Sequence, residues 1–183
     1  MKVIFLDHDG VICLHDNWGT RSGKKKKFLA QNPECDLPVE ARLDNFDKKS
    51  IKVLNSILEK SGADIVVSSD WKLHATLDEM GNYYEQQGII KKPIAFTQNL
   101  SDFDKSAAGL YSWKGWQERA RCLEIQKYLS DNPIVKKWVS VDDLPMGKDY
   151  LGEGGLDNFV ICKRSREGIK QLGLEEKIIS FLI

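Results

Sequence analysis

Residues 2–11 read KVIFLDHDGV, and this stretch decides the fold of the chain. The run from Val3 to Leu6 is continuously apolar, which is typical of a strand that is covered on both faces of a parallel sheet. Asp7 and Asp9 follow it, and Gly10 allows a tight turn after them. Because ligands of open α/β sheets bind at the carboxyl ends of the strands, the stretch predicts a site built around two carboxylates.

Two carboxylates this close repel each other unless a cation or a shared proton relieves them. The spacing therefore indicates either a metal site or one ionised acid beside one protonated acid. An EF-hand calcium loop is disfavoured, because its twelfth position needs a bidentate acid and that position, counted from Asp7, is Trp18. A plain acidic turn stays open for this motif alone, since short motifs recur by chance.

Size and composition predict a single globular domain over residues 1–183. The chain has 183 residues, of which 42% are hydrophobic and 30% are charged, as in ordinary globular proteins. Its 27 basic and 27 acidic residues balance, so no overall charge attracts the protein to nucleic acid or to a membrane. Any such attraction has to be local.

The cysteines and apolar runs indicate a cytoplasmic protein. Cysteines at positions 13, 35, 122 and 162 are far apart, which argues against a Cys-x-x-Cys motif or a Cys/His zinc site and favours reduced thiols. No run approaches the roughly 20 apolar residues of a membrane helix. Asp7 and Asp9 interrupt the first run too early for a signal peptide. We therefore expect no membrane partner.

Apolar runs alternate with helical stripes along the chain, which predicts an α/β fold with a parallel sheet. Four further strands are expected at residues 63–71, 93–97, 138–143 and 158–162. Helices are expected at residues 47–60, 73–87, 117–129 and 174–182. Two stretches without clear periodicity, at about 13–45 and 98–116, are expected to be irregular inserts.

The two inserts carry side chains of interest. The first contains a dense basic run, whose lysines can hold a polyanion beside a phosphate site, although most such runs are simply solvated surface. These lysines are Lys24, Lys25, Lys26 and Lys27. The second insert carries aromatic residues that can line a substrate cleft, namely Phe103, Tyr111 and Trp113.

Polar groups end three of the expected strands. Asp7 and Asp9 end the first, the pair Ser68 and Ser69 ends the second, and Asp142-Asp143 ends the fourth. Right-handed crossovers bring all carboxyl ends of a parallel sheet to one edge, so these groups are expected to converge. Serine hydroxyls there can donate to a phosphate oxygen, but they are also ordinary turn residues. The convergence indicates a functional site more strongly than any one motif does.

This set resembles the haloacid dehalogenase superfamily of phosphotransferases. Residues 7–11 are similar to its first motif, Asp-x-Asp-x-[Val/Thr]; Ser68 or Ser69 is similar to its second, and Asp142-Asp143 to its fourth. The resemblance implies a Rossmann-like, three-layer, doubly wound parallel sheet with strand order 5-4-1-2-3 and a small or absent cap.

More narrowly, three segments look like the branch found in Swiss-army-knife RNA-repair proteins. They are residues 62–72, the helix with Arg121 and Glu124-Ile125, and residues 167–169. The third motif of the superfamily is usually a Lys, whereas Arg121 matches that position here, with Arg119 and Lys114 as the other candidates. A guanidinium binds phosphate as a fork and an ammonium as a point charge.

The resemblance implies a magnesium-dependent phosphatase. Asp7 is expected to attack phosphorus and form an aspartyl-phosphate, and Asp9 to protonate the leaving oxygen and then activate water. Mg²⁺ is expected on Asp7, the backbone carbonyl of Asp9 and Asp142, with Asp143 in support. Either serine and Arg121 are expected to bind the phosphate oxygens. A residue between two site residues on a strand faces the other side, so His8 is interpreted as packing.

The substrate stays open between a polynucleotide 3′-phosphate end, a free nucleotide and another small phosphomonoester. A receiver-type signalling domain uses similar groups on a similar sheet, but there the acidic pair precedes the phosphorylated Asp, and here it follows. A non-catalytic nucleotide-binding or partner-binding module with the same fold is a further alternative, because fold does not fix function.

Overall fold

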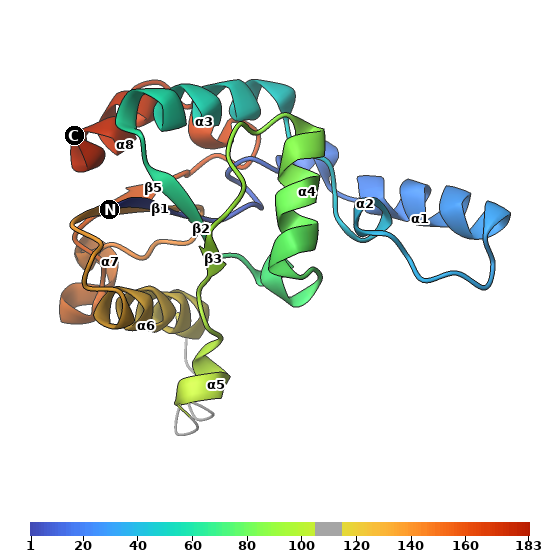
Figure 1. Ribbon diagram of the computed structural model, residues 1–183. Helices are drawn as coiled ribbons and strands as arrows, with labels where there is room; N and C mark the ends of the chain where they lie inside the picture. Colours follow the sequence, from blue (N-terminus) through green and yellow to red (C-terminus); the bar gives the residue numbers. More distant parts are fainter. Residues whose placement is uncertain (105–114) are drawn as a thin grey trace.

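In the computed structural model, which describes residues 1–104 and 115–183, five parallel strands form one sheet (Figure 1). The strands are β1 (Lys2–Leu6), β2 (Asp64–Val67), β3 (Ala95–Phe96), β4 (Lys137–Asp142) and β5 (Phe159–Ile161). Their order across the sheet is β3-β2-β1-β4-β5. The predicted α/β class and strand order are confirmed.

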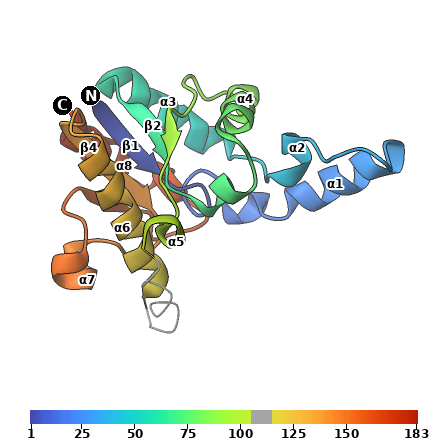
Figure 2. The same cartoon turned by 60° about the horizontal axis from the view of Figure 1, so that its bottom comes forward.

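Helices cover both faces of the sheet, which gives the predicted three layers (Figures 1 and 2). The helices that pack on one face are α3 (Lys48–Ser61), α4 (Leu77–Gln87) and α8 (Leu174–Leu182). On the other face lie α6 (Trp116–Asp131) and the short α7 (Lys148–Leu151). The remaining α-helices of the described residues are α1 (Thr20–Gln31), α2 (Val39–Arg42) and α5 (Leu100–Phe103). None of the helices in the described ranges is long and apolar enough to cross a membrane.

The apolar run of β1 serves two cores. Ile4 and Leu6 point into the cluster beneath α3 and α8, whereas Val3 and Phe5 point into the cluster beneath α6. All four side chains are fully buried. Since successive side chains of a strand point to opposite faces, a strand covered on both faces has no polar position, which explains the absence of alternation in the sequence.

The register of the sheet aligns the strand ends. Leu6 is paired with Val67 of β2 and with Val141 of β4. The residues that follow, Asp7, Ser68 and Asp142, therefore leave the sheet at one level. The convergence predicted from the strand order follows directly from this register.

The segment 13–45, which was expected to be irregular, contains α1 and α2. These helices project from the body as an arm, defined here as residues 20–42 (Figures 1 and 2). Asp44 stabilises the start of α1, because its Oδ1 accepts from the backbone N–H of Arg21 at 2.7 Å and from the Thr20 hydroxyl at 3.2 Å. A distant carboxylate at a helix N-terminus leaves no local sequence signal.

Helix α4 begins later than expected. A short 3₁₀-helix, η2 (Asp70–Leu73), comes first, and α4 starts only after Thr76. Thr76 and Glu79 form a reciprocal capping box, in which each side chain accepts from the other residue's backbone N–H. This signal is present in the sequence, and the expected start at Leu73 was wrong. The third strand is also shorter than expected, with only Ala95 and Phe96 paired to β2.

Asp47 joins the start of α3 to the C-terminal part of the chain. Its Oδ1 accepts from the Ser50 backbone N–H at 2.8 Å, as an N-cap, and from the Lys170 ammonium at 2.8 Å. We expect Asp47→Ala to lower the free energy of unfolding by about 1–2 kcal/mol, because the cap and the ion pair are both lost. Urea unfolding measures this change. Asp47→Asn keeps an acceptor for Ser50 and should lose less; equal losses in the two variants would contradict the capping role.

Candidate active site

An open cavity of about 450 Å³ lies at the carboxyl ends of β1, β2 and β4. The predicted site residues Asp7, Asp9, Ser69, Arg121 and Asp143 all line it. They come from segments far apart in the sequence, and the shared edge of the sheet brings them together.

Three acids form the centre of the site. Each of Asp7, Asp142 and Asp143 offers a carboxylate oxygen, and these oxygens lie within 4.8 Å of one another. Asp7 and Asp142 are buried, with 4% and 1% of their surfaces exposed, so water screens their repulsion only weakly. Oxygen donors in such a group suit a hard divalent cation such as Mg²⁺.

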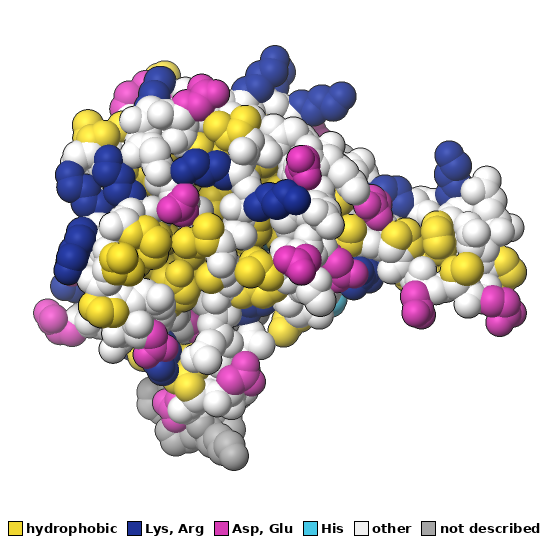
Figure 3. Space-filling model, viewed as in Figure 1, with side chains coloured by type: hydrophobic (Ala, Val, Ile, Leu, Met, Phe, Trp, Pro, Cys, Tyr) yellow, Lys and Arg dark blue, Asp and Glu magenta, His cyan; other side chains and the backbone are white. Residues whose placement is uncertain are grey.

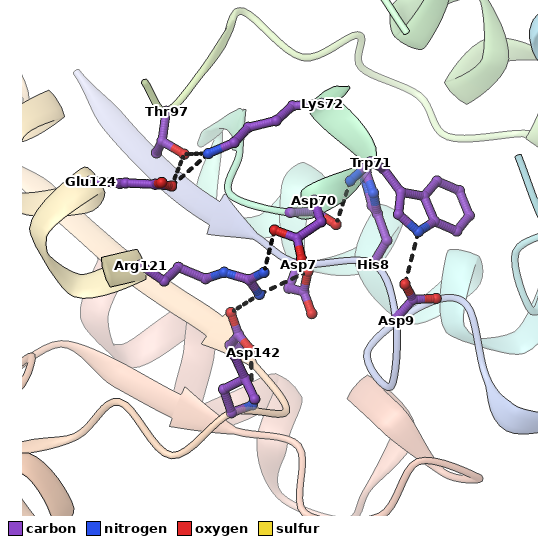
Figure 4. A network of polar contacts seen from close by, with 12 residues as sticks. Asp7, His8, Asp9, Asp70, Trp71, Lys72, Thr97, Arg121, Glu124 and Asp142 are labelled. Carbon is purple, nitrogen blue, oxygen red and sulfur yellow. Dashed lines mark hydrogen bonds and ion pairs between the residues drawn. The ribbon is translucent and has the colours of Figure 1, made fainter. Parts of the chain in front are cut away.

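Arg121 of α6 holds two of these acids. Its Nη1 lies 3.1 Å from Asp7 Oδ1 and 2.9 Å from Asp142 Oδ2, and its Nη2 lies 3.2 Å from Asp70 Oδ1 (Figure 4). The guanidinium thus bridges the ends of β1 and β4. When Asp7, Asp142 and Asp143 are all ionised, Arg121 offsets one of their three negative charges, and the two that remain equal the charge of a divalent cation.

The protonation of the acids reflects this excess. Burial, together with the charge of Asp142, raises the pKa of Asp7 well above the usual range of a carboxyl, although Arg121 and the Ser69 hydroxyl oppose the rise. Burial likewise raises the pKa of Asp142 to about 6. For Asp143, burial and then the charge of Asp7 raise the pKa to about 6. Binding of a cation would therefore favour the ionised form of these acids and stabilise the folded protein, which is consistent with a metal site.

Gly10 lets the two acid-bearing segments approach. Its φ of +70° is a left-handed conformation that favours glycine. A Cβ atom on Gly10 would lie only 2.3 Å from Asp143 Oδ2. The Gly of the first motif is therefore needed both for the turn after β1 and for the space that Asp143 occupies.

The two serines at the end of β2 differ in their contacts. The Ser69 side chain is hydrogen-bonded to Asp7 and lines the cavity. The Ser68 hydroxyl is buried, has no hydrogen-bond partner among the described residues, and does not line the cavity. Of the two, Ser69 is the one positioned beside a group bound at Asp7.

The candidates for the third motif also differ. Arg121 lies in the acid cluster, as described above, whereas the Arg119 guanidinium lies beside Gly154, away from that cluster. Lys114, Tyr111 and Trp113 lie outside the described residues, and Phe103 is not among the residues that line the cavity.

Asp9 has a partner that the sequence analysis missed. Trp71 of η2 donates its indole N–H to Asp9 Oδ2 at 2.9 Å (Figure 4). The indole is 5% exposed and stacks on Phe46 with ring centroids 5.3 Å apart, so the donor is held in place. Partial burial raises the pKa of Asp9, and the bond from Trp71 opposes this rise. One oxygen of Asp9 is thus fixed while the residue still lines the cavity.

A buried ion pair at the cavity edge was also missed. The Lys72 ammonium contacts Glu124 Oε2 at 2.5 Å and the Thr97 hydroxyl at 3.1 Å, and Glu124 Oε1 accepts from the backbone N–H of Leu100 at 2.9 Å. Glu124 lies one helical turn after Arg121 on α6. The pair therefore connects η2, the segment after β3 and the helix that carries Arg121.

His8 packs away from the site, as interpreted from the strand alternation. It is fully buried among Phe46, Trp71 and Tyr84, and its Nε2 is hydrogen-bonded to the Tyr84 hydroxyl at 2.6 Å. Burial, followed by the charge of Arg121, lowers the pKa of His8 to about 3. The ring is a neutral part of the core.

The four lysines of the basic run do not act as one group. Successive residues of a helix point about 100° apart, so α1 distributes them around its axis. Lys24 donates to the Leu43 carbonyl at 2.6 Å and to Asn45 Oδ1 at 3.0 Å, which ties the arm together. Lys25 lines a second cavity, whereas Lys26 and Lys27 are exposed and line neither of these two cavities.

Comparison with known proteins identifies the family. The sequence pattern of the family described as "HAD domain in Swiss Army Knife RNA repair proteins" matches residues 3–171. The chain belongs to this family. Searches of curated proteins and of solved structures gave no match.

Membership of the HAD domain family fits the geometry of the site. The family consists generally of hydrolases and phosphatases that use Mg²⁺, and the buried acid cluster is able to bind such an ion. The receiver-type alternative is wrong: receiver domains have the strand order 2-1-3-4-5, whereas β1 here lies between β2 and β4.

Asp143→Asn tests the charge excess. Well below pH 3.8 the Asp143 carboxyl is protonated in both the folded and the unfolded state, so its ionisation makes no difference in stability between the two proteins there. As the pH rises past the unfolded-state pKa of 3.8 toward the folded-state value of about 6, the unfolded wild type releases its proton first and the folded state loses stability. At pH 7 without metal the variant should be more stable by about 1 kcal/mol, a value reduced because Asp143 is partly exposed.

Thermal unfolding in chelator and in Mg²⁺ measures both effects. Wild-type Tm should rise on adding Mg²⁺, and the rise should be much smaller in Asp143→Asn. Asp149→Asn, a change on the exposed side of α7, serves as the control of equal charge. A Tm response to Mg²⁺ that is the same in all three proteins would contradict a metal site at the acid cluster.

Proposed function

We propose that this chain is a Mg²⁺-dependent phosphomonoester hydrolase that acts through an aspartyl-phosphate on Asp7. The observation that carries the proposal is the meeting of Asp7, Asp142 and Asp143 beside Arg121 at an open cavity. Phosphoryl transfer needs a nucleophile, positive charge around the phosphoryl oxygens and access for the substrate. Each of these has a candidate group here.

Asp7 is the proposed nucleophile. A carboxylate oxygen of Asp7 attacks phosphorus, and the bond from phosphorus to the leaving alcohol oxygen breaks. Arg121 binds Asp7 Oδ1 at 3.1 Å and Ser69 is hydrogen-bonded to the same side chain, so the carboxylate is fixed in one orientation. Orientation of the nucleophile lowers the entropic part of the barrier.

Asp9 is the proposed general acid and base. It donates a proton to the leaving alkoxide in the first step. In the second step it takes a proton from water, which attacks phosphorus and releases Asp7 and inorganic phosphate. The raised pKa of Asp9 favours a carboxyl that is protonated when the first step begins.

Arg121 and Ser69 are proposed to bind the phosphoryl oxygens, Arg121 through its guanidinium fork. Asp7, Asp142 and Asp143, with the backbone carbonyl of Asp9, would hold Mg²⁺, which would supply positive charge to offset the acids and the phosphoryl group. The Lys72–Glu124 pair is proposed to position α6, and with it Arg121.

The proposed substrate is a nucleotide or a polynucleotide 3′-phosphate end. The family takes its description from RNA repair proteins, which favours the polymer end. Because the net charge of the protein is zero, it does not attract long polyanions, which favours a short contact at the 3′ end of the nucleic acid. A non-catalytic binding module with this fold is the second candidate, and the same experiment separates the two.

Asp7→Asn should abolish turnover of an aryl phosphate, with a loss of at least about 10³-fold in kcat, because an amide is a poor nucleophile. Phosphate release is measured in Mg²⁺ and in excess chelator, and the chelator should abolish phosphate release by the wild type. Asp149→Asn, the same change on the exposed side of α7 and outside the cavity, is the matched control. Full inactivity of the wild type on aryl phosphates and 3′-phosphorylated oligonucleotides would favour the binding module.

Trp71→Phe tests whether the hydrogen bond from the Trp71 indole positions Asp9. Phe keeps the stacking on Phe46 and removes the N–H donor, so Asp9 should be misplaced as a proton donor. The kcat/KM is compared because it reports the steps up to release of the alcohol and excludes the second step, in which Asp9 acts as a base on both substrates. An alkyl phosphate needs a proton on its leaving oxygen, and its kcat/KM should fall by about tenfold, whereas p-nitrophenol leaves without that proton and the kcat/KM of p-nitrophenyl phosphate should change less than about threefold. Equal losses on both substrates would show a purely structural role for Trp71.

A further inference from the structure

A second cavity adjoins the candidate active site. It has a volume of about 770 Å³ and lies between the arm and the segment that begins α4. Leu73 lines both this cavity and the acid cavity, so the two are neighbours. We call the second cavity the arm groove; Figure 3 shows the arm that forms one wall as a projection set apart from the body.

The arm groove is basic, in contrast to the acid cavity. Arg21, Lys25 and Arg42 line it, and Glu79 is the acid among its lining residues. Glu79 is already paired with Arg42 and accepts from the backbone of Thr76. The Arg21 guanidinium lies 3.7 Å from Asp44 Oδ2, and the Lys25 ammonium makes no ion pair with the described residues. Two cations therefore remain available to an anion.

The groove is a built feature of the fold. Arg42 donates to the His74 carbonyl at 2.9 Å and pairs with Glu79, which fixes the arm to the body. Leu37, Ala41 and Leu73 give the groove an apolar part between the charged groups. Leu73 separates the groove from the acid cavity, so the basic wall of the groove stands next to the candidate active site.

We propose that the arm groove binds the phosphodiester and nucleoside next to the terminal phosphate, with Lys25 and Arg21 on the phosphodiester. This inference rests on the proposed phosphatase function and specifies its substrate as a nucleic-acid chain end. The cations suit a second phosphate, and the apolar part suits a sugar or base. A mononucleotide leaves the groove empty, so the enzyme prefers a chain with at least one internal phosphodiester.

Charge reversal at two adjacent lysines gives a matched test. Lys25→Glu changes a residue that lines the groove, and Lys26→Glu makes the same charge change on the exposed surface of the same helix. The kcat/KM is measured for a 3′-phosphorylated dinucleotide, for the same compound with an uncharged methylphosphonate linkage, and for a 3′-mononucleotide. Lys25→Glu should lower the value for the first substrate by about tenfold and leave the other two within about twofold.

Salt gives an independent readout. Two phosphate contacts on a single strand predict that kcat/KM for the dinucleotide falls with salt with a log–log slope of about −1.4, and Lys25→Glu should make the slope shallower. Lys26→Glu should match the wild type in both measurements. A loss that is equal for all three substrates, or equal in the two variants, would overturn the proposal.

Direct binding separates this inference from the proposed function. Fluorescence anisotropy with a labelled dinucleotide that carries a non-hydrolysable 3′-phosphonate measures binding to the wild type without turnover. Weaker binding in Lys25→Glu alone would support the groove even if the phosphatase proposal fails. Hydrolysis of a phosphoserine peptide in preference to the dinucleotide, with the same dependence on Lys25, would overturn the assignment to nucleic acid.

Discussion

The repulsion between carboxylates at the ends of β1 and β4 is the constraint on which the rest of the site depends. The sheet register places Asp7 and Asp142 level with each other, and burial prevents water from screening them. Arg121 offsets part of the charge, and burial, together with the remaining charge, raises the pKa values of all three acids. A buried arrangement of like charges lowers stability unless something binds it. Its presence at an open cavity is therefore better explained by function than by stability.

The surrounding elements keep this unfavourable arrangement in place. Gly10 removes the Cβ that would displace Asp143, and Trp71 holds Asp9 from the side opposite the cluster. The Lys72–Glu124 ion pair connects η2 to α6 and so helps to fix the position of α6, which carries Arg121. These supports come from three segments, namely the turn after β1, η2 and α6. The acids can be kept close only because each segment is itself anchored in one of the two cores.

Sequence reasoning predicted the features that depend on local pattern. The unbroken apolar run of β1, the acids after β1 and β4, and the helical stripe of α3 each lie within one segment, and the strand order came from the family resemblance. It failed where a contact joins distant residues. The start of α1 depends on Asp44, and the hold on Asp9 depends on Trp71, 62 positions away in the chain. The capping box at Thr76 was visible in the sequence and was overlooked. The sequence could not show that Lys24 contacts Leu43 and Asn45 while Lys25 lines the arm groove, because both depend on how the arm packs against the body.

The arrangement of charge also bears on how a neutral protein can bind a polyanion. With equal numbers of acidic and basic residues, long-range attraction is absent, and binding has to come from short-range contacts. The acid cavity repels a phosphate until a cation fills the cluster, so the terminal phosphate contributes little to affinity without metal. Basic side chains on the arm lie beyond the acids, where they are not neutralised by the cluster. Under the two proposals, this separation of charge would let the acids serve the chemistry while the arm binds the nucleic-acid chain.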